Sequence, residues 1–149
     1  MGVVALARLP RPRSMPLSDA SPSPARYDAA LGALLGALAG DAAGATLEFI
    51  GHTPRLAEVE RAMRYPGGGV LQVAPGQITD DGELTLCLLQ ALAESREFSL
   101  ERIASWYGRW LNSSPFDIGN ATSSGFGPAR GLPFAVQPGL AGRMQLAAQ

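Results

Sequence analysis

Two adjacent carboxylates follow a hydroxyl side chain at Thr79-Asp80-Asp81, where the sequence predicts the start of a helix. Carboxylate and hydroxyl oxygens are the ligands that a hard cation such as Mg²⁺ prefers. Neighbouring helix positions point in different directions, so the two acids could bridge two ions or reach both an ion and a substrate. The other interpretation is structural: Thr79 caps the helix, and each acid complements its dipole by about 0.3–1 kcal/mol. Taken alone, these three residues are more typical of a helix start than of a metal site.

Three further carboxylates lie in sequence surroundings that could support chemistry. Asp41 interrupts a run of alanine and glycine in a predicted helix, where a charge is costly unless it is paired or solvated. Glu48 lies between two apolar residues, which can raise the pKa of a carboxyl group for acid–base catalysis. Asp117 precedes a glycine and asparagine turn, where an aspartate is usually a cap. Taken singly, Glu48 is also compatible with an exposed loop.

The composition excludes several other kinds of site. The chain of 149 residues carries 12 arginines, no lysine and 13 acids, and its formal charge is −1. Binding of nucleic acid through phosphate neutralisation is therefore not expected. The only cysteine, Cys87, and the only histidine, His52, leave no intrachain disulfide, cysteine-based zinc site or histidine-rich metal site. We interpret Trp106 and Trp110 as core residues rather than as a stacking platform.

The elements that must carry these residues are helices. Apolar side chains at helical spacing, with capping residues before them, predict helices over 26–46, 53–65, 80–94 and 99–111. Asp117 is interpreted as the cap of one more helix, and the second of these helices is expected to begin with Thr53 as its cap. No alternating pattern typical of strands persists, so the predicted fold class is an all-α helical bundle.

The first predicted helix has two notable faces. Leu31, Leu34, Leu35 and Leu38 share one face that we expect to be buried. Glycine recurs at every fourth position, at residues 32, 36, 40 and 44, and each glycine costs about 1 kcal/mol relative to alanine in a helix. Either close packing of another helix or the approach of a ligand to the backbone would account for them.

The two ends of the chain lack a helical pattern. Residues 1–25 are rich in proline, serine and arginine and are predicted to be disordered, residues 26–122 form the folded part, and residues 123–149 are predicted to be an irregular tail. A membrane span over 26–46 is disfavoured because Asp41 at its centre costs about 2.5–3.5 kcal/mol on insertion. We expect a protein that does not cross a membrane.

Together the three sets of carboxylates resemble the signatures of the ADP-ribosylglycohydrolase family. The segment from Leu31 to Gly44, followed by Glu48-Phe49, resembles the opening helix of that family. Residues 76–86, GQITDDGELTL, resemble its metal motif, and residues 117–122, DIGNAT, resemble its third signature. The motifs occur in the family's order and spacing, and the resemblance covers about residues 27–122, whereas the tail over 123–149 does not resemble the family.

The resemblance implies an all-α fold with a binuclear magnesium site, and hydrolysis of the bond that joins ADP-ribose to a protein side chain or another acceptor. Thr79, Asp80 and Asp81 would be ligands of Mg²⁺. Glu48 and Asp117 would be catalytic, Glu48 beside the ribose or the attacking water and Asp117 as a base or a substrate-positioning carboxylate. The expected partner is an ADP-ribosylated protein or small molecule, with no nucleic acid and no membrane, and the expected location is cytoplasmic.

Two departures from the family pattern bear on activity. Gly82 stands where the family has threonine after the acid pair, and no acid follows Asp117, whereas the family completes its metal site with two aspartates and a hydroxyl residue near its C-terminus. We therefore expect a truncated domain with weak or no turnover, and a tail from a shifted reading frame or a premature end. The alternative function is a non-catalytic helical module that binds ADP-ribose or a protein partner.

Overall fold

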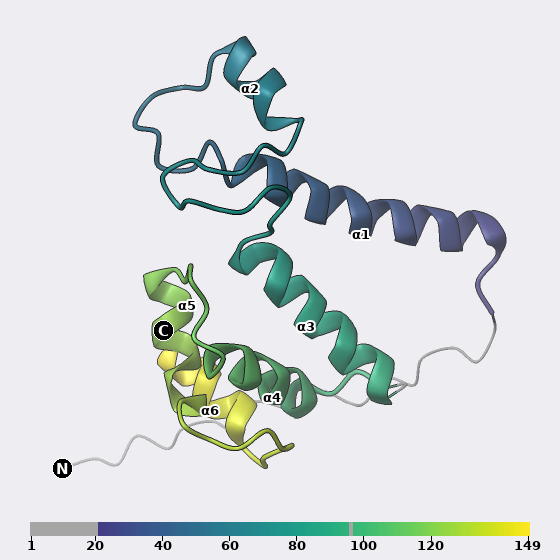
Figure 1. The fold of residues 1–149 in the computed structure, drawn as a ribbon. Coiled ribbons are helices and arrows are strands. Elements are labelled where there is room, and N and C mark those ends of the chain that lie inside the picture. The colour runs from purple at the N-terminus through teal and green to yellow at the C-terminus, as the bar shows by residue number, and fades with distance from the viewer. Residues whose placement is uncertain (1–20, 96) are drawn as a thin grey trace.

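The computed structural model describes residues 21–95 and 97–149 (Figure 1), and helices dominate both ranges. The elements are α1 (Pro24–Gly44), α2 (Leu56–Ala62), α3 (Asp80–Ser95), α4 (Leu100–Leu111), α5 (Asn120–Phe126), the 3-10 helix η1 (Gly127–Ala129) and α6 (Leu140–Ala147). No strand occurs in the described ranges, although an isolated antiparallel bridge joins Gly68 to Val73. The predicted all-α class is confirmed.

Helix α4 lies at the centre of the packing and contacts α3, α5, η1 and α6. Its sequence explains this place, because Ser99 accepts a hydrogen bond from the backbone of Arg102 at the helix start and one face of the helix is apolar and buried. Gly108 lets η1 approach, since a Cβ atom there would lie 2.9 Å from the Cβ atom of Ala129. The indole N–H of Trp110 donates to the carboxylate of Glu83 and so joins α4 to α3.

The prediction of an irregular tail over 123–149 is wrong. Helix α6 contributes Leu140, which is 2% exposed, to a buried cluster with residues of α4 and η1. Glu101 of α4 accepts the backbone N–H groups of Gly139 and Ala141, both at 3.1 Å, and thereby caps α6. The helices in this segment have seven, three and eight residues, which is too short to show a helical period in the sequence.

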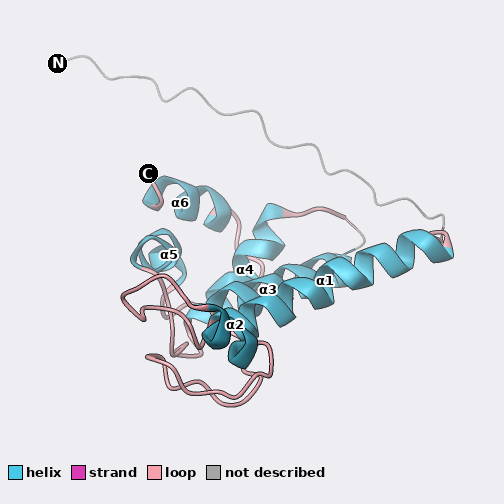
Figure 2. Ribbon diagram, turned by 90° about the horizontal axis from the view of Figure 1, so that it is seen from above, coloured by secondary structure: helices cyan, strands magenta, loops and turns pink. Residues whose placement is uncertain are grey.

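Among the described residues, helix α1 packs on other helices through its C-terminal end, where Ala42 and Ala43 are buried beside the start of α3. Its first part extends beyond the other helices (Figure 2). Leu31 and Leu35 are 40% and 54% exposed, so the buried face expected for this helix is wrong within the described residues. A hydrophobic period shows which side of a helix can be buried, but not whether a partner is present.

Helix α2 begins later than expected, and no described element covers its apolar side. Arg55 rather than Thr53 is its N-cap, and the backbone N–H of Arg55 donates to the carboxylate of Glu58 at 2.8 Å. Leu56 and Met63 are 75% and 59% exposed. This helix does not contribute side chains to the cavity described below.

The predicted disordered segment over 1–25 lies mostly outside the described residues, which begin at residue 21. Its last residues are helical, because the hydroxyl of Ser23 accepts the N–H of Arg26 at 3.4 Å and α1 starts at Pro24. None of the described helices combines the length and the apolar character that crossing a bilayer requires.

Candidate active site

The first turn of α3 is held by a carboxylate from α1. Asp41 Oδ2 accepts the backbone N–H groups of Thr79 and Gly82, both at 2.9 Å, and Oδ1 accepts the hydroxyl of Thr79. These bonds satisfy N–H groups that a helix start leaves free, and they place the negative charge at the positive end of the helix dipole. The prediction that Thr79 caps α3 with its side chain is wrong, because its hydroxyl donates to Asp41, which is the capping group.

Gly82 provides the space for this arrangement. A Cβ atom at residue 82 would overlap Oδ2 of Asp41 and would lie 2.9 Å from the Cβ atom of Ile78. The absence of a side chain at residue 82 therefore lets the carboxylate of Asp41 reach the backbone of α3.

An open cavity of about 370 Å³ lies between the C-terminal end of α1 and the start of α3. Its lining residues come from α1, the turn after it and the first residues of α3: Gly40, Asp41, Gly44, Ala45, Leu47, Glu48, Thr79 and Asp81. A Cβ atom on any of the four regularly spaced glycines of α1 would meet nothing within 4 Å. Close helix packing therefore does not explain these glycines within the described residues, whereas Gly40 and Gly44 do give backbone surface to the cavity.

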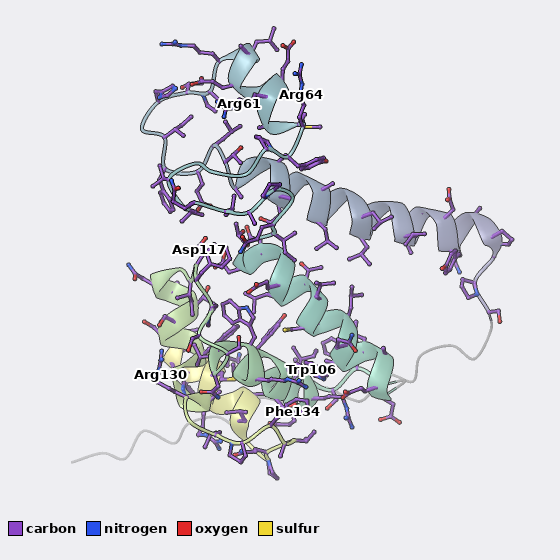
Figure 3. All side chains as sticks on the ribbon, viewed as in Figure 1. Arg61, Arg64, Trp106, Asp117, Arg130 and Phe134 are labelled. Carbon is purple, nitrogen blue, oxygen red and sulfur yellow. The ribbon has the colours of Figure 1, made fainter. Side chains whose placement is uncertain are left out.

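Asp117 lies in the loop before α5, facing the start of α3 (Figure 3). The backbone N–H of Gly119 in this loop donates to Asp80 Oδ2 at 3.4 Å. Gly119 is the N-cap of α5, so the interpretation of Asp117 as a helix cap is wrong. Burial, followed by the negative charge of Asp80, raises the pKa of Asp117, while the backbone N–H of Ile118 opposes that rise.

Glu48 shares this negative environment. Burial raises the pKa of its carboxyl group, and the charges of four aspartates raise it further, in the order Asp117, Asp80, Asp81 and Asp41. Carboxylates that repel one another hold protons more readily than isolated ones. The raised pKa values of Glu48 and Asp117 mean that these two carboxyl groups take up a proton more readily than isolated ones, which suits acid–base work on a bound substrate.

The raised pKa of Glu48 predicts how stability depends on pH. A carboxyl group with a raised pKa in the folded state disfavours folding when charged, and this cost disappears as pH falls through that pKa. Glu48→Gln should therefore raise the free energy of unfolding at pH 7, and its advantage over the unsubstituted chain should shrink as pH falls toward the ordinary value of 4.5.

Urea unfolding at pH 7 and pH 5 measures this difference. Glu60→Gln is the matched control, because Glu60 is exposed on α2 and takes no part in the cavity. An advantage of Glu48→Gln that stays constant over this range would contradict a raised pKa of Glu48 in the folded chain.

The donor types around the cavity suit a hard divalent cation. Thr79, Asp80 and Asp81 offer consecutive oxygen atoms, and a cation would relieve the repulsion that raises the pKa values of Glu48 and Asp117. Within 21–95 and 97–149, no three acidic, histidine or cysteine side chains are gathered closely enough to hold a metal ion by themselves. The oxygen donors are of the type that Mg²⁺ takes, and magnesium binding by them stays a prediction.

A sequence model of the ADP-ribosylglycohydrolase family matches residues 22–148. This chain belongs to the ADP-ribosylglycohydrolase family. The match includes residues 123–148, which the three motifs did not relate to the family. It therefore agrees with the folded tail and extends the family resemblance almost to the end of the chain.

The chain is similar to ADP-ribosylglycohydrolase relatives from different organisms. The chain is 42% identical over 104 residues to an ADP-ribosyl-(dinitrogen reductase) glycohydrolase of Rhodospirillum rubrum, covering 68% of this chain and 35% of that protein. It is 40% identical over 102 residues to the ADP-ribosylarginine hydrolase Tri1 of Pseudomonas putida, covering 64% of this chain and 26% of that protein. The chain thus spans about a third or less of the length of these relatives.

The structure brings the predicted ADP-ribosylglycohydrolase residues into one region. Glu48, Thr79 and Asp81 line the cavity, and Asp80 and Asp117 are near enough to raise the pKa of Glu48. Their catalytic and metal-binding roles stay predictions. The sequence did not reveal that Asp41 holds α3, although a carboxylate within an alanine and glycine helix was a signal that it needed a partner.

Proposed function

We propose that this chain supplies part of the active site of a magnesium-dependent hydrolase that releases ADP-ribose from a protein side chain or another acceptor. One observation carries the proposal: Glu48 and Asp81 line one cavity, and Asp80 and Asp117 lie near enough to raise the pKa of Glu48, although these carboxylates come from three separate segments. The names of the relatives support the substrate class, since one is an ADP-ribosylarginine hydrolase and another is a glycohydrolase of ADP-ribosyl dinitrogen reductase.

The chemistry of the residues suits cleavage of a glycosidic bond. Positive charge develops on the sugar in the transition state, and nearby carboxylates stabilise it. Glu48, with its raised pKa, can hold a proton for the leaving group, and Asp117 can accept one from the attacking water. Thr79, Asp80 and Asp81 would hold Mg²⁺, which when bound supplies Lewis-acid stabilisation of negatively charged oxygen atoms.

The chain on its own should turn over weakly or not at all, because its described residues do not gather a complete ligand group. The assay is release of ADP-ribose from an ADP-ribosylated arginine peptide, with Mg²⁺ or with EDTA. Any release should need Mg²⁺ and should disappear in Asp117→Asn, whereas Asp28→Asn, an exposed position on α1, should behave like the unsubstituted chain. Fast turnover would contradict the weak activity, and release in EDTA would contradict the magnesium dependence.

A non-catalytic helical module is the second candidate, favoured by the apolar side chains exposed on α1 and α2, such as Leu35 and Leu56. Titration calorimetry tests whether the chain has a site for ADP-ribose. Heat on mixing the chain with ADP-ribose, lost in Asp117→Asn, supports such a site, and absence of heat supports a module that binds a protein partner, whereas turnover in the assay above separates a hydrolase from a module that only binds. The cytoplasmic location remains part of the proposal.

A further inference from the structure

The Thr79 hydroxyl is held in one orientation. Among the described residues it donates to Oδ1 of Asp41 alone, and the carboxylate can accept but not donate. The hydroxyl proton therefore points toward α1. Thr79 is 3% exposed and lines the cavity, so the oxygen lone pairs that this bond does not use are left for a partner there.

We infer that Asp41 is a positioning residue: it fixes the proton of the Thr79 hydroxyl on the side of α1, so that the oxygen meets a bound cation with its lone pairs only. The inference rests on the proposed function, because it assigns a role toward the proposed Mg²⁺. A hydroxyl free to rotate would spend part of its time with its proton directed at the cation, which weakens the interaction. Groups that orient a metal ligand in this way typically change metal affinity by about 10–100-fold.

Two other contacts make Asp41 suitable for this role. Oδ2 is held by the backbone N–H groups of Thr79 and Gly82, so the carboxylate cannot rotate away from the hydroxyl without losing both bonds. The absence of a side chain at Gly82 leaves room for Oδ2. The same carboxylate thus fixes the backbone that carries Asp80 and Asp81 and the orientation of the hydroxyl beside them.

Asp41→Asn separates the two effects. The carbonyl oxygen of asparagine can still accept the N–H groups of Thr79 and Gly82, so the cap is retained. Its amide group would donate to the Thr79 oxygen, and the hydroxyl proton would turn away from α1. We expect the variant to keep its fold and its protection of the two backbone N–H groups, while its affinity for Mg²⁺ falls by about 10–100-fold.

Thr79→Val and the double variant test whether Asp41 acts through the hydroxyl. Adding Asp41→Asn to Thr79→Val should cause no further loss of Mg²⁺ affinity, because the oxygen that Asp41 orients is already absent. Thr79→Ser keeps the hydroxyl and should therefore lose less Mg²⁺ affinity than Thr79→Val. Additive losses in the double variant would overturn the inference and would indicate that Asp41 acts through the backbone alone.

Two measurements on the full chain distinguish the possible failures. Titration calorimetry with MgCl₂ gives the affinity, and NMR of the metal-free chain gives hydrogen exchange of the Thr79 hydroxyl and of the N–H groups at 79 and 82. A slowly exchanging hydroxyl in the unsubstituted chain, lost in Asp41→Asn with both N–H groups still protected, supports the inference. Unchanged Mg²⁺ affinity in that variant overturns it, whereas an unsubstituted chain that binds no Mg²⁺ overturns the proposed function and the role of Asp41 that depends on it.

Discussion

Replacing Asp80 and Asp81 together with asparagine should lower the affinity for Mg²⁺ by more than the ~10–100-fold that outer-shell changes cost, because both proposed carboxylate ligands lose their charge. Asparagine has nearly the same shape and size as aspartate, so the effect reports on the loss of charge. Titration calorimetry with MgCl₂ measures it. Asp28→Asn, on the exposed first part of α1, removes one charge far from the cavity and should leave the affinity unchanged.

The same double variant tests the structural interpretation of the acid pair. If the two carboxylates only complement the dipole of α3, removing their charges should cost about 0.3–1 kcal/mol each in the free energy of unfolding and should not alter Mg²⁺ binding. If they belong to a cation site, the loss in the free energy of unfolding is offset in the metal-free chain, because removing their charges relieves the repulsion with Glu48 and Asp117. Unchanged Mg²⁺ affinity with a clear loss of stability would contradict the metal site.

Leu140→Ala should destabilise the chain by about 2–5 kcal/mol, because leucine side chains removed from a packed core leave a cavity. Leu140 is 2% exposed and lies in the cluster that joins α6 to α4 and η1. Chemical denaturation followed by circular dichroism measures the change. Leu146→Ala on the same helix is the matched control, since Leu146 is 63% exposed and its loss should change the free energy of unfolding by no more than about 0.5 kcal/mol.

Equal stability of the Leu140→Ala and Leu146→Ala variants would show that α6 is not part of the cooperative fold. In that event the family match over 22–148 would need another explanation for its last part. A large difference would establish that the tail contributes to the core that supports α4.

The helices with long apolar periods could be predicted from the sequence. Residues 80–94 and the helix after Ser99 appear in the structure as α3 (Asp80–Ser95) and α4 (Leu100–Leu111), because each pattern runs for three turns or more and begins with a recognisable helix start. The tail could not be predicted, since its short helices are stabilised by contacts with α4 across long sequence distances, such as those of Glu101.

The candidate site, too, could be predicted from the sequence only in part. The motifs that contain Glu48, Thr79 and Asp117 could be recognised, but no local sequence pattern predicts that their segments lie close together in the fold. The bonds from Asp41 to Thr79 and Gly82 span 38 and 41 residues, so they are set by how α1 lies on α3. The raised pKa of Glu48 likewise depends on tertiary structure, because burial and the charges of carboxylates distant in sequence cause it.

Asp41 also couples the shape of the cavity to the docking of a helix. In the part of the chain that the structure describes, the last part of α1 packs on α3, and the bonds from Asp41 lie within that contact. Detachment of α1 would therefore release the first turn of α3 and dismantle the cavity in a single cooperative opening, rather than in independent steps. Any molecule that binds the exposed part of α1 and holds this helix on α3 would slow this opening and keep the cavity assembled for longer.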